Sequence, residues 1–224
     1  LAYEEVPMLC TQPGMSELDP EGVFRATLSV MRRVLQESGG AAGVPTAGAH
    51  EAGARREPMT LQAIGFSTQM HSFLAVDGEG THLTNVLTWA DSRPLPQSLE
   101  LDRRYDAADL YRRTGCRVQH PSYPLSKILW LKATRPDAFA AARRFLTLKS
   151  YVLFRLYGVH VADRTDASCT ALLGIRTFRW DDDILHGILE IGADRLPEVV
   201  DCDFLLRGMR KEYADHIGIP ADLP

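Results

Sequence analysis

Residues 61–93 read LQAIGFSTQMHSFLAVDGEGTHLTNVLTWADSR, and this stretch decides the fold class that the sequence predicts. It contains short apolar runs at residues 61–67, 73–76 and 86–89. Runs of this length between polar or small residues are typical of strands. The sequence Asp-Gly-Glu-Gly at residues 77–80 predicts a turn after the second run. The stretch therefore predicts three strands with polar side chains near their ends.

Helical patterns lie on both sides of this stretch. Asp19-Pro20-Glu21 has the features of a helix start, and apolar residues then recur at helical spacing up to Gly39. Further helices are predicted at 102–113, 123–132, 137–144 and 151–157, with a short strand at 145–148. A last helix is predicted to be capped by residues 180–183 and to run to Leu189. Residues 39–58 are rich in Gly and Ala and predict a flexible surface loop. The order of elements predicts one α/β domain with a mixed central sheet.

Composition limits the classes of partner. The 224 residues carry 25 Lys+Arg and 29 Asp+Glu, a formal net charge of −4, so no cationic excess favours nucleic acid or an anionic membrane surface. No apolar run approaches the roughly 20 residues of a membrane-spanning helix, and the acidic N-terminus is unlike a signal peptide. The four cysteines form no C-x-x-C pair and are expected to be buried free thiols. The sequence thus predicts a cytoplasmic protein without nucleic-acid or membrane partners, and leaves a homodimer open.

The densest polar cluster lies at the ends of the predicted strands. Gln69 and His71 follow the first run, and Asp91 and Arg93 follow the third. Their donors and acceptors suit a polyhydroxylated ligand, Arg93 suits a carboxylate, and Trp89 offers an apolar face. The alternative is structural: residues 91–93 would then cap a helix with a surface Arg, and His71 would be a satisfied core histidine.

Two weaker clusters follow. Residues 121–127 predict Tyr123 and Lys127 at the mouth of a pocket, where Lys127 could attract an anion; the alternative is a helix start with an exposed Lys. Residues 163–168 form a small polar loop in which Asp166 could contact a ligand; the alternative is a cap and turn. The sequence contains none of the common phosphate-loop, dinucleotide, nucleophile-elbow or zinc-protease motifs.

Six stretches, taken in order, resemble the FGGY family of carbohydrate kinases. They are IGFSTQMHSFLAVD (64–77), TNVLTWADSR (84–93), YRRTG (111–115), HPSYPLSKILWL (120–131), TLKSYVLFRLYG (147–158) and DRTDASCTALLGIRTFRWDDDIL (163–185). The resemblance covers nearly the whole of 1–224 apart from residues 39–58. Within the family, residues 70–77, 88–93 and 120–127 are most similar to gluconokinases. Ketopentose kinases more typically carry Gly where this chain has Ser72, and an Asn-Asp-Gly-Arg type sequence after the Trp.

The resemblance implies an actin-like ATPase (ribonuclease H-like) domain, the first of two in a sugar kinase. It implies ATP-dependent phosphorylation of a sugar acid, D-gluconate to 6-phospho-D-gluconate, with ATP and Mg²⁺ as cofactors. By resemblance the substrate-binding residues are Gln69, Met70, His71, Trp89, Asp91, Arg93, Lys127 and Asp166, and none of them is the catalytic base. Family members begin with a hairpin that carries an Asp-x-Gly-Thr motif, and their base lies in a Gly-x-x-Asp-Gly type segment. Neither is in residues 1–224, so the nucleotide-binding second domain and the base are expected outside this chain, which alone is expected to be inactive.

Two rival functions stay open from the sequence. One keeps the reaction and changes the substrate to that of a xylulokinase-like ketose or polyol kinase. The other is a catalytically incomplete sugar-binding fragment. Gluconate differs from a neutral sugar in its carboxylate, so a gluconate site is expected to use a cation such as Arg93.

Overall fold

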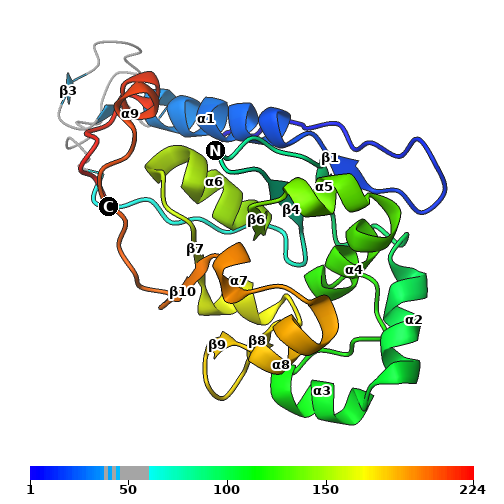
Figure 1. Ribbon diagram of the computed structural model, residues 1–224. Coiled ribbons are helices and arrows are strands. Elements are labelled where there is room, and N and C mark those ends of the chain that lie inside the picture. Colours follow the sequence, from blue (N-terminus) through cyan, green and yellow to red (C-terminus); the bar gives the residue numbers. More distant parts are fainter. Residues whose placement is uncertain (38–39, 42–43, 46–60) are drawn as a thin grey trace.

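The computed structural model describes residues 1–37, 40–41, 44–45 and 61–224 (Figure 1). The helices are α1 (Pro20–Glu37), α2 (Leu95–Arg104), α3 (Ala107–Thr114), α4 (Pro124–Thr134), α5 (Pro136–Ala141), α6 (Leu148–Tyr157), α7 (Arg164–Ser168), α8 (Asp182–Ile184), the π-helical turn η1 (Leu185–Leu189), the 3-10 turn η2 (Ala193–Arg195) and α9 (Lys211–Ile217). The strands are β1 (Glu17–Leu18), β2 (Gly40–Ala41), β3 (Val44–Pro45), β4 (Leu74–Val76), β5 (Val86–Leu87), β6 (Arg144–Leu146), β7 (Val161–Asp163), β8 (Leu173–Gly174), β9 (Arg179–Trp180) and β10 (Glu198–Val200).

Strand β4 connects the strands that position the site. It pairs antiparallel with β6. Phe73, just before β4, exchanges two backbone hydrogen bonds of 3.0 and 2.8 Å with Leu87 of β5, and β5 pairs antiparallel with β1. Elsewhere β7 and β10 are parallel, whereas β8 with β9 and β2 with β3 are antiparallel. Both strand orientations occur, as the predicted mixed sheet requires, but in short ladders.

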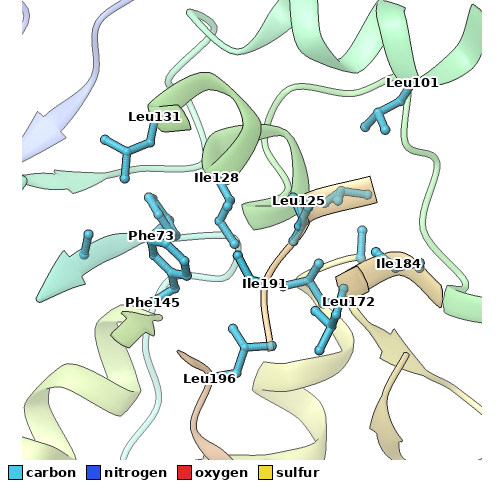
Figure 2. Close-up of a cluster of buried hydrophobic side chains, with 14 of the residues drawn as sticks. Phe73, Leu101, Leu125, Ile128, Leu131, Phe145, Leu172, Ile184, Ile191 and Leu196 are labelled. Carbon is cyan, nitrogen blue, oxygen red and sulfur yellow. The ribbon is translucent and has the colours of Figure 1, made fainter. Parts of the chain in front are cut away.

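The two faces of these strands are covered by different helices. Alternate side chains of a strand point to opposite faces, and β4 follows this rule. Phe73 and Ala75 enter one core, and Leu74 and Val76 enter another. The α4-side core, drawn in Figure 2, includes Phe73, Leu87, Leu101, Leu110, Leu125, Ile128, Leu131, Phe145, Leu172, Ile184 and Leu185. The α1-side core includes Phe24, Leu28, Leu74, Val86, Leu146, Tyr151, Val152, Leu156 and Ile217. The strands are therefore buried on both faces, with α1, α6 and α9 on one side and α2 to α5 and α8 on the other.

Local sequence signals explain several helix ends. The Asp19 carboxylate accepts a hydrogen bond from the Gly22 amide at 2.9 Å at the start of α1. The Thr147 hydroxyl accepts one from the Ser150 amide at 3.2 Å at the start of α6. Helix α6 ends at Gly158, whose φ of 75° is the left-handed conformation that glycine adopts without steric cost. These ends match the predicted helix start at Asp19 and the predicted helix end at Gly158.

The predicted strand at 61–67 is wrong. The segment runs as irregular chain from Leu61 to Gln69, and in the described part of the protein it joins no ladder. Its Ile64 amide donates to the Pro224 carbonyl at 2.9 Å, and Ile64 and Phe66 pack on the α1-side core. The apolar pattern therefore reports core packing, while a strand also needs a partner for its backbone groups. The polar residues at 67–72 consequently precede β4 rather than follow a strand.

Two helix predictions also need correction. The predicted helix at 102–113 is divided between α2 and α3, because Asp106 caps α3 by accepting from the Ala108 and Asp109 amides at 2.9 and 3.0 Å. The predicted last helix is only the short α8 followed by η1, and α9 comes later. Its seven residues give too short a pattern to be distinguished from a loop. Within the predicted loop at 39–58, β2 pairs with β3, and the rest of that prediction lies outside the described residues.

The four cysteines are free thiols, as predicted, but their burial differs. Cys116 is buried and Cys169 half-buried, whereas Cys10 and Cys202 are exposed, so the expectation of buried thiols is wrong for the last two. Among the helices of the described residues, none has the length and hydropathy needed to cross a membrane.

Candidate functional site

The predicted site residues from the first cluster gather at one edge of the β4–β5 pair. The two strands are antiparallel, so the start of β4 and the end of β5 lie side by side. Met70 and His71 precede β4, and Trp89 follows β5. Met70 is 57% exposed and Trp89 is 58% exposed. Large apolar side chains held open at adjacent strand ends offer a surface for the carbon side of a ligand.

His71 has the most constrained backbone of this group. Its φ is +62°, a left-handed conformation that is uncommon outside glycine but several-fold enriched in His, Asn and Asp. Its Nδ1 lies 2.7 Å from the Cys169 carbonyl, and its ring meets that of Tyr123 edge-on at 4.8 Å between centroids. Because a carbonyl can only accept, Nδ1 carries the proton and Nε2 is left as an acceptor. Burial lowers the pKa of His71, and the positive charge of Lys127 adds to this, so the ring is neutral at neutral pH.

Lys127 does not lie at a pocket mouth, which corrects its predicted place. Its side chain is 0% exposed, and the ammonium donates to the backbone carbonyls of His71, of Leu87 at 3.2 Å and of Thr88 at 2.8 Å. The alternative of an exposed lysine is wrong as well. Burial lowers the pKa of Lys127 to about 7, although the Asp91 carboxylate acts in the opposite direction. In this structure Lys127 joins the two strand ends and does not face solvent.

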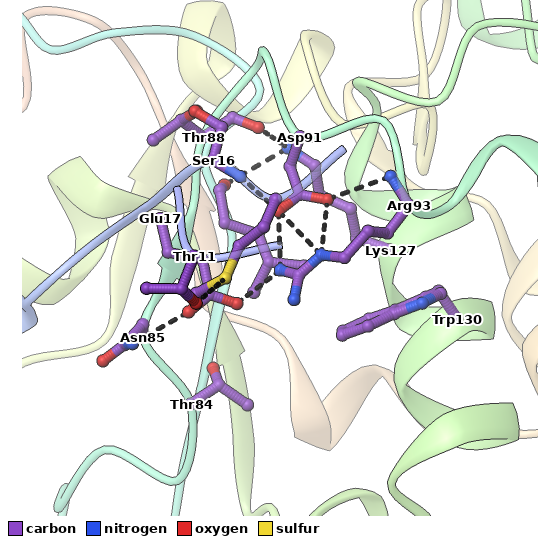
Figure 3. Close-up of polar contacts among 12 residues, drawn as sticks. Thr11, Ser16, Glu17, Thr84, Asn85, Thr88, Asp91, Arg93, Lys127 and Trp130 are labelled. Carbon is purple, nitrogen blue, oxygen red and sulfur yellow. Dashed lines mark hydrogen bonds and ion pairs between the residues drawn. The ribbon is translucent and has the colours of Figure 1, made fainter. Parts of the chain in front are cut away.

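Asp91 and Arg93 are joined to each other and to β1 (Figure 3). The Asp91 carboxylate is fully buried and accepts from the Ser16 amide at 3.0 Å. The Arg93 side chain is 12% exposed, and its guanidinium pairs with Asp91 at 2.6 Å and with Glu17. It also stacks over the Trp130 ring at 4.5 Å from the centroid. The predicted alternative of a surface Arg is therefore wrong.

The charge of Arg93 is stabilised inside this network. Burial works against the charged guanidinium, but hydrogen bonds and charge interactions with Asp91 and Glu17 outweigh it and raise the pKa of Arg93. Glu17 also accepts from the Asn85 side-chain amide at 2.8 Å. The donors on Nε and Nη2 of Arg93 are thus occupied by protein carboxylates. A ligand carboxylate that bound Nε or Nη2 would have to compete with these two internal anions.

The third cluster forms a cap and turn, the structural alternative that the sequence left open. The Asp163 carboxylate accepts from the Thr165 and Asp166 amides at 3.1 and 3.2 Å at the start of α7. Asp166 is buried and is hydrogen-bonded to the Thr147 hydroxyl. Burial raises the pKa of Asp166 despite this hydrogen bond. Helix α7 nevertheless borders the site, because Cys169 directly after it contacts His71.

The eight predicted residues thus divide into two groups. Met70 and Trp89 are exposed and His71 and Gln69 are half-buried at the strand ends, where the Gln69 carbonyl accepts from the Ser72 hydroxyl at 3.3 Å. Asp91, Arg93, Lys127 and Asp166 are buried or nearly so and bind other parts of the chain.

Sequence reasoning missed Glu17 and Trp130, which both contact Arg93. Each touches Arg93, yet Glu17 lies 76 positions away from it along the chain. No local pattern reports such a contact.

A cleft of about 190 Å³ lies away from these residues. It is bordered by residues 63–66 and 200–206 and by the ion pair of Lys149 with Asp163 at 2.7 Å. The predicted site residues do not line it, so the candidate site is the open surface around His71 and Trp89.

Comparison with known proteins identifies the family of the chain. A sequence profile described as the FGGY family of carbohydrate kinases, N-terminal domain, matches residues 1–224. The gluconokinase of Bacillus subtilis (strain 168) is 26% identical over 218 residues, which is 97% of this chain and 39% of that protein. The glycerol kinase of Janthinobacterium sp. (strain Marseille) is 30% identical over 205 residues, covering 89% and 38%. The xylulose kinase of Bacillus subtilis (strain 168) is 29% identical over 195 residues, covering 87% and 35%.

Solved structures give the same family. The crystal structure of gluconate kinase from Lactobacillus acidophilus matches with a TM-score of 0.84 at 30% identity, over 98% of this chain and 40% of that one. The ligand-bound xylulose kinase from the same organism matches with the same values. These matches confirm the predicted actin-like α/β fold class. The chain spans about two fifths of the length of the relatives that it matches. On this evidence the chain belongs to the FGGY family of carbohydrate kinases and corresponds to the N-terminal domain of that family.

Proposed function

We propose that this chain is the sugar-binding domain of an ATP-dependent kinase whose acceptor is D-gluconate. The observation that supports the substrate most directly is the similarity over nearly the whole chain to gluconokinases at 26% and 27% identity and to the gluconate kinase structure. The domain assignment rests on the family match over residues 1–224.

The proposed role of the site is to hold the acceptor in line for phosphoryl transfer. Positioning of this kind can supply up to roughly 7–11 kcal/mol of the barrier reduction. In the proposal, His71 Nε2 accepts a hydrogen bond from a ligand hydroxyl, and Met70 and Trp89 pack against the carbon chain. Gln69 adds donor and acceptor groups beside them. The four buried or nearly buried residues do not touch the ligand in this proposal and act by holding other parts of the chain in place. They are Asp91, Arg93, Lys127 and Asp166.

ATP and Mg²⁺ enter this proposal through the family. A glycerol kinase structure similar in fold, from Plasmodium falciparum, is described with ADP. In the described part of this chain, no group of three or more His, Cys, Asp or Glu side chains is placed to hold a metal ion. The proposal therefore assigns no residue of this chain to the ion and no step through it.

The test is a coupled assay of ADP formation by the complete polypeptide that contains this chain. Gluconate, xylulose and glycerol are compared at equal concentrations, and we expect kcat/KM for gluconate to exceed the others by at least about tenfold, a difference of about 1.4 kcal/mol. A preference for xylulose or glycerol would contradict the substrate assignment. Absence of phosphorylation of all three would contradict the kinase assignment.

A matched pair of histidine variants tests the role of the site. His71→Asn suits the left-handed backbone but removes the imidazole acceptor, so kcat/KM for the acceptor is expected to fall about two- to tenfold, as for one neutral hydrogen bond. His216→Ala, on the exposed face of α9, is the control and is expected to leave it unchanged. If the two variants have equal kcat/KM for the acceptor, His71 does not take part in acceptor binding.

A xylulose acceptor is the second candidate. It is supported by the ligand-bound xylulose kinase, whose TM-score and identity equal those of the gluconate kinase. It predicts that a neutral ketose is used at least as well as gluconate in the same assay.

A further inference from the structure

Lys127 has an unusual environment for a lysine. Its side chain is fully buried at the start of α4, and its ammonium contacts three backbone carbonyls. Leu87 is the last residue of β5, Thr88 directly follows it, and His71 belongs to the turn before β4. One nitrogen therefore fixes the two chain segments that carry His71 and Trp89.

Burying this ammonium costs free energy, and its hydrogen bonds join two chain segments and do not contribute to the packing of the apolar core. Taking a charged group out of water costs several kcal/mol unless it is paired and hydrogen-bonded. The neighbours of Lys127 on α4, Leu125 and Ile128, pack in the α4-side core as ordinary apolar residues. The Leu87 carbonyl also accepts from the Phe73 amide, and the Thr88 carbonyl also accepts from the Asp91 amide. The ammonium thus adds a link between the two segments next to the backbone pair of Phe73 and Leu87.

We propose that Lys127 is a positioning residue that holds His71 and Trp89 in register, so that the ligand-facing surface is ordered only while its ammonium is charged. The inference rests on the proposed function, because it assumes that this surface binds the acceptor. Lys127 itself does not touch the ligand. Its removal therefore acts on acceptor binding through the backbone of His71 and Thr88.

Titratable groups lie on several of the segments around this ammonium, and among them Asp91 acts on its charge. Asp91 and Arg93 lie on the segment after β5, Glu17 on β1, His71 before β4, and Tyr123 at the start of α4 itself. Asp91 favours the charged form, whereas burial opposes it and dominates, lowering the pKa of Lys127 to about 7. Burial lowers the pKa of His71 from its ordinary value, and the positive charge of Lys127 acts in the same direction.

A rise in pH is then expected to increase the contribution of Lys127 to fold stability and to decrease the ordering of the segments that carry His71 and Trp89. Above about pH 7 the folded protein releases the Lys127 proton while the unfolded chain keeps it up to the ordinary value of 10.5. The unfolded state binds more protons over this range, so the contribution of Lys127 to stability becomes more favourable as pH rises. The neutral amine, however, has only two N–H donors for three carbonyls. Acceptor binding is therefore expected to weaken over the range in which this stability contribution increases.

The decisive variant is Lys127→Met in the complete polypeptide, with Lys132→Met as the matched control. Lys132 lies on the same helix, but it forms a solvent-exposed ion pair with Glu190 at 2.7 Å. We expect Lys127→Met to raise KM for the acceptor at least about tenfold, as for one hydrogen bond to a charged group, with KM for ATP and the control unchanged. Acceptor KM in the wild type is expected to rise above about pH 7 and to be independent of pH in Lys127→Met. An unchanged acceptor KM in Lys127→Met would overturn the proposal.

A second measurement needs neither substrate nor a folded variant at position 127. Acrylamide quenching of Trp89, obtained as the difference between the wild type and Trp89→Phe, reports the order of this segment directly. We expect it to increase as pH rises through about 7 while the thermal unfolding midpoint does not fall. Quenching that is independent of pH would contradict the role of Lys127, whichever sugar the protein phosphorylates. If quenching depends on pH but gluconate is not phosphorylated, the positioning role of Lys127 is supported and only the assignment of gluconate as the acceptor is contradicted.

Discussion

The guanidinium of Arg93 is held between the carboxylates of Asp91 and Glu17 and against the Trp130 ring. This geometry changes what its removal should do. A residue that pairs with a ligand carboxylate discriminates between charged and neutral ligands. A residue that pairs with buried protein carboxylates supports the site for both kinds of ligand.

Arg93→Ala should therefore lower kcat/KM for gluconate and for a neutral sugar by similar factors. It should also destabilise the fold by about 3 kcal/mol, because it leaves the Asp91 carboxylate buried without its partner. Arg112→Ala on the exposed face of α3 is the control, with a change below about 1 kcal/mol. Chemical denaturation and steady-state kinetics of both variants provide the measurement. A loss confined to gluconate would restore Arg93 as the carboxylate-binding residue that the sequence suggested.

At this scale the sequence identified the polar residues but not their partners. Trp89 could be placed because it ends an apolar run that forms β5, whereas His71 was expected after a strand at 61–67 and instead precedes β4. The burial of Lys127 could not be predicted, because a Lys after a helix start usually faces solvent. Its carbonyl partners are at least 39 positions away along the chain, and only the packing of α4 against the β4–β5 pair brings them together.

The turn after β4 places a strict demand on one glycine. Gly80 has a φ of +85°, and a Cβ added there would lie 2.2 and 2.3 Å from two ring carbons of Phe154. That ring is stacked on His160 with 4.2 Å between centroids, so it cannot easily move aside. Gly78 in the same turn has open space around its Cβ position.

Gly80→Ala is expected to destabilise the protein by about 1–3 kcal/mol, through backbone strain and overpacking against α6. Gly78→Ala is the matched control and should change stability by less than about 0.5 kcal/mol. Thermal unfolding of the two variants side by side measures the difference. Equal midpoints would mean that the turn rearranges freely and that Phe154 does not restrain it.

The elements that were predicted correctly are those with both a pattern and a local stop signal. Helix α6 ends at Gly158 as predicted. The segment 61–67 has the pattern of a strand but lacks a ladder partner among the described residues, and pattern alone cannot report the partner. The division between α2 and α3 depends on Asp106, whose capping hydrogen bonds outweigh a helical pattern that continues through it.

The two cores of the molecule share the same strands, which bears on how the protein unfolds. Phe73 and Leu74 are adjacent in sequence yet belong to different cores, as do Phe145 and Leu146. Neither core can lose its packing without exposing one face of β4 and β6. The domain is therefore expected to unfold as one cooperative unit.

The three tryptophans make this testable, because Trp130 and Trp180 pack on the α4-side core and Trp89 lies at the exposed edge of the site. Ile128→Ala in the α4-side core and Leu156→Ala in the α1-side core each truncate a fully buried side chain. Each substitution should lower the free energy of unfolding by about 2–5 kcal/mol. Because the strands couple the cores, Leu156→Ala should lower the tryptophan-monitored denaturation midpoint about as much as Ile128→Ala, although no tryptophan packs on its side. Leu99→Ala on the exposed face of α2 is the control. A Leu156→Ala variant that loses far-ultraviolet circular dichroism early, while its tryptophan signal keeps the wild-type midpoint, would show that the α1-side core unfolds on its own.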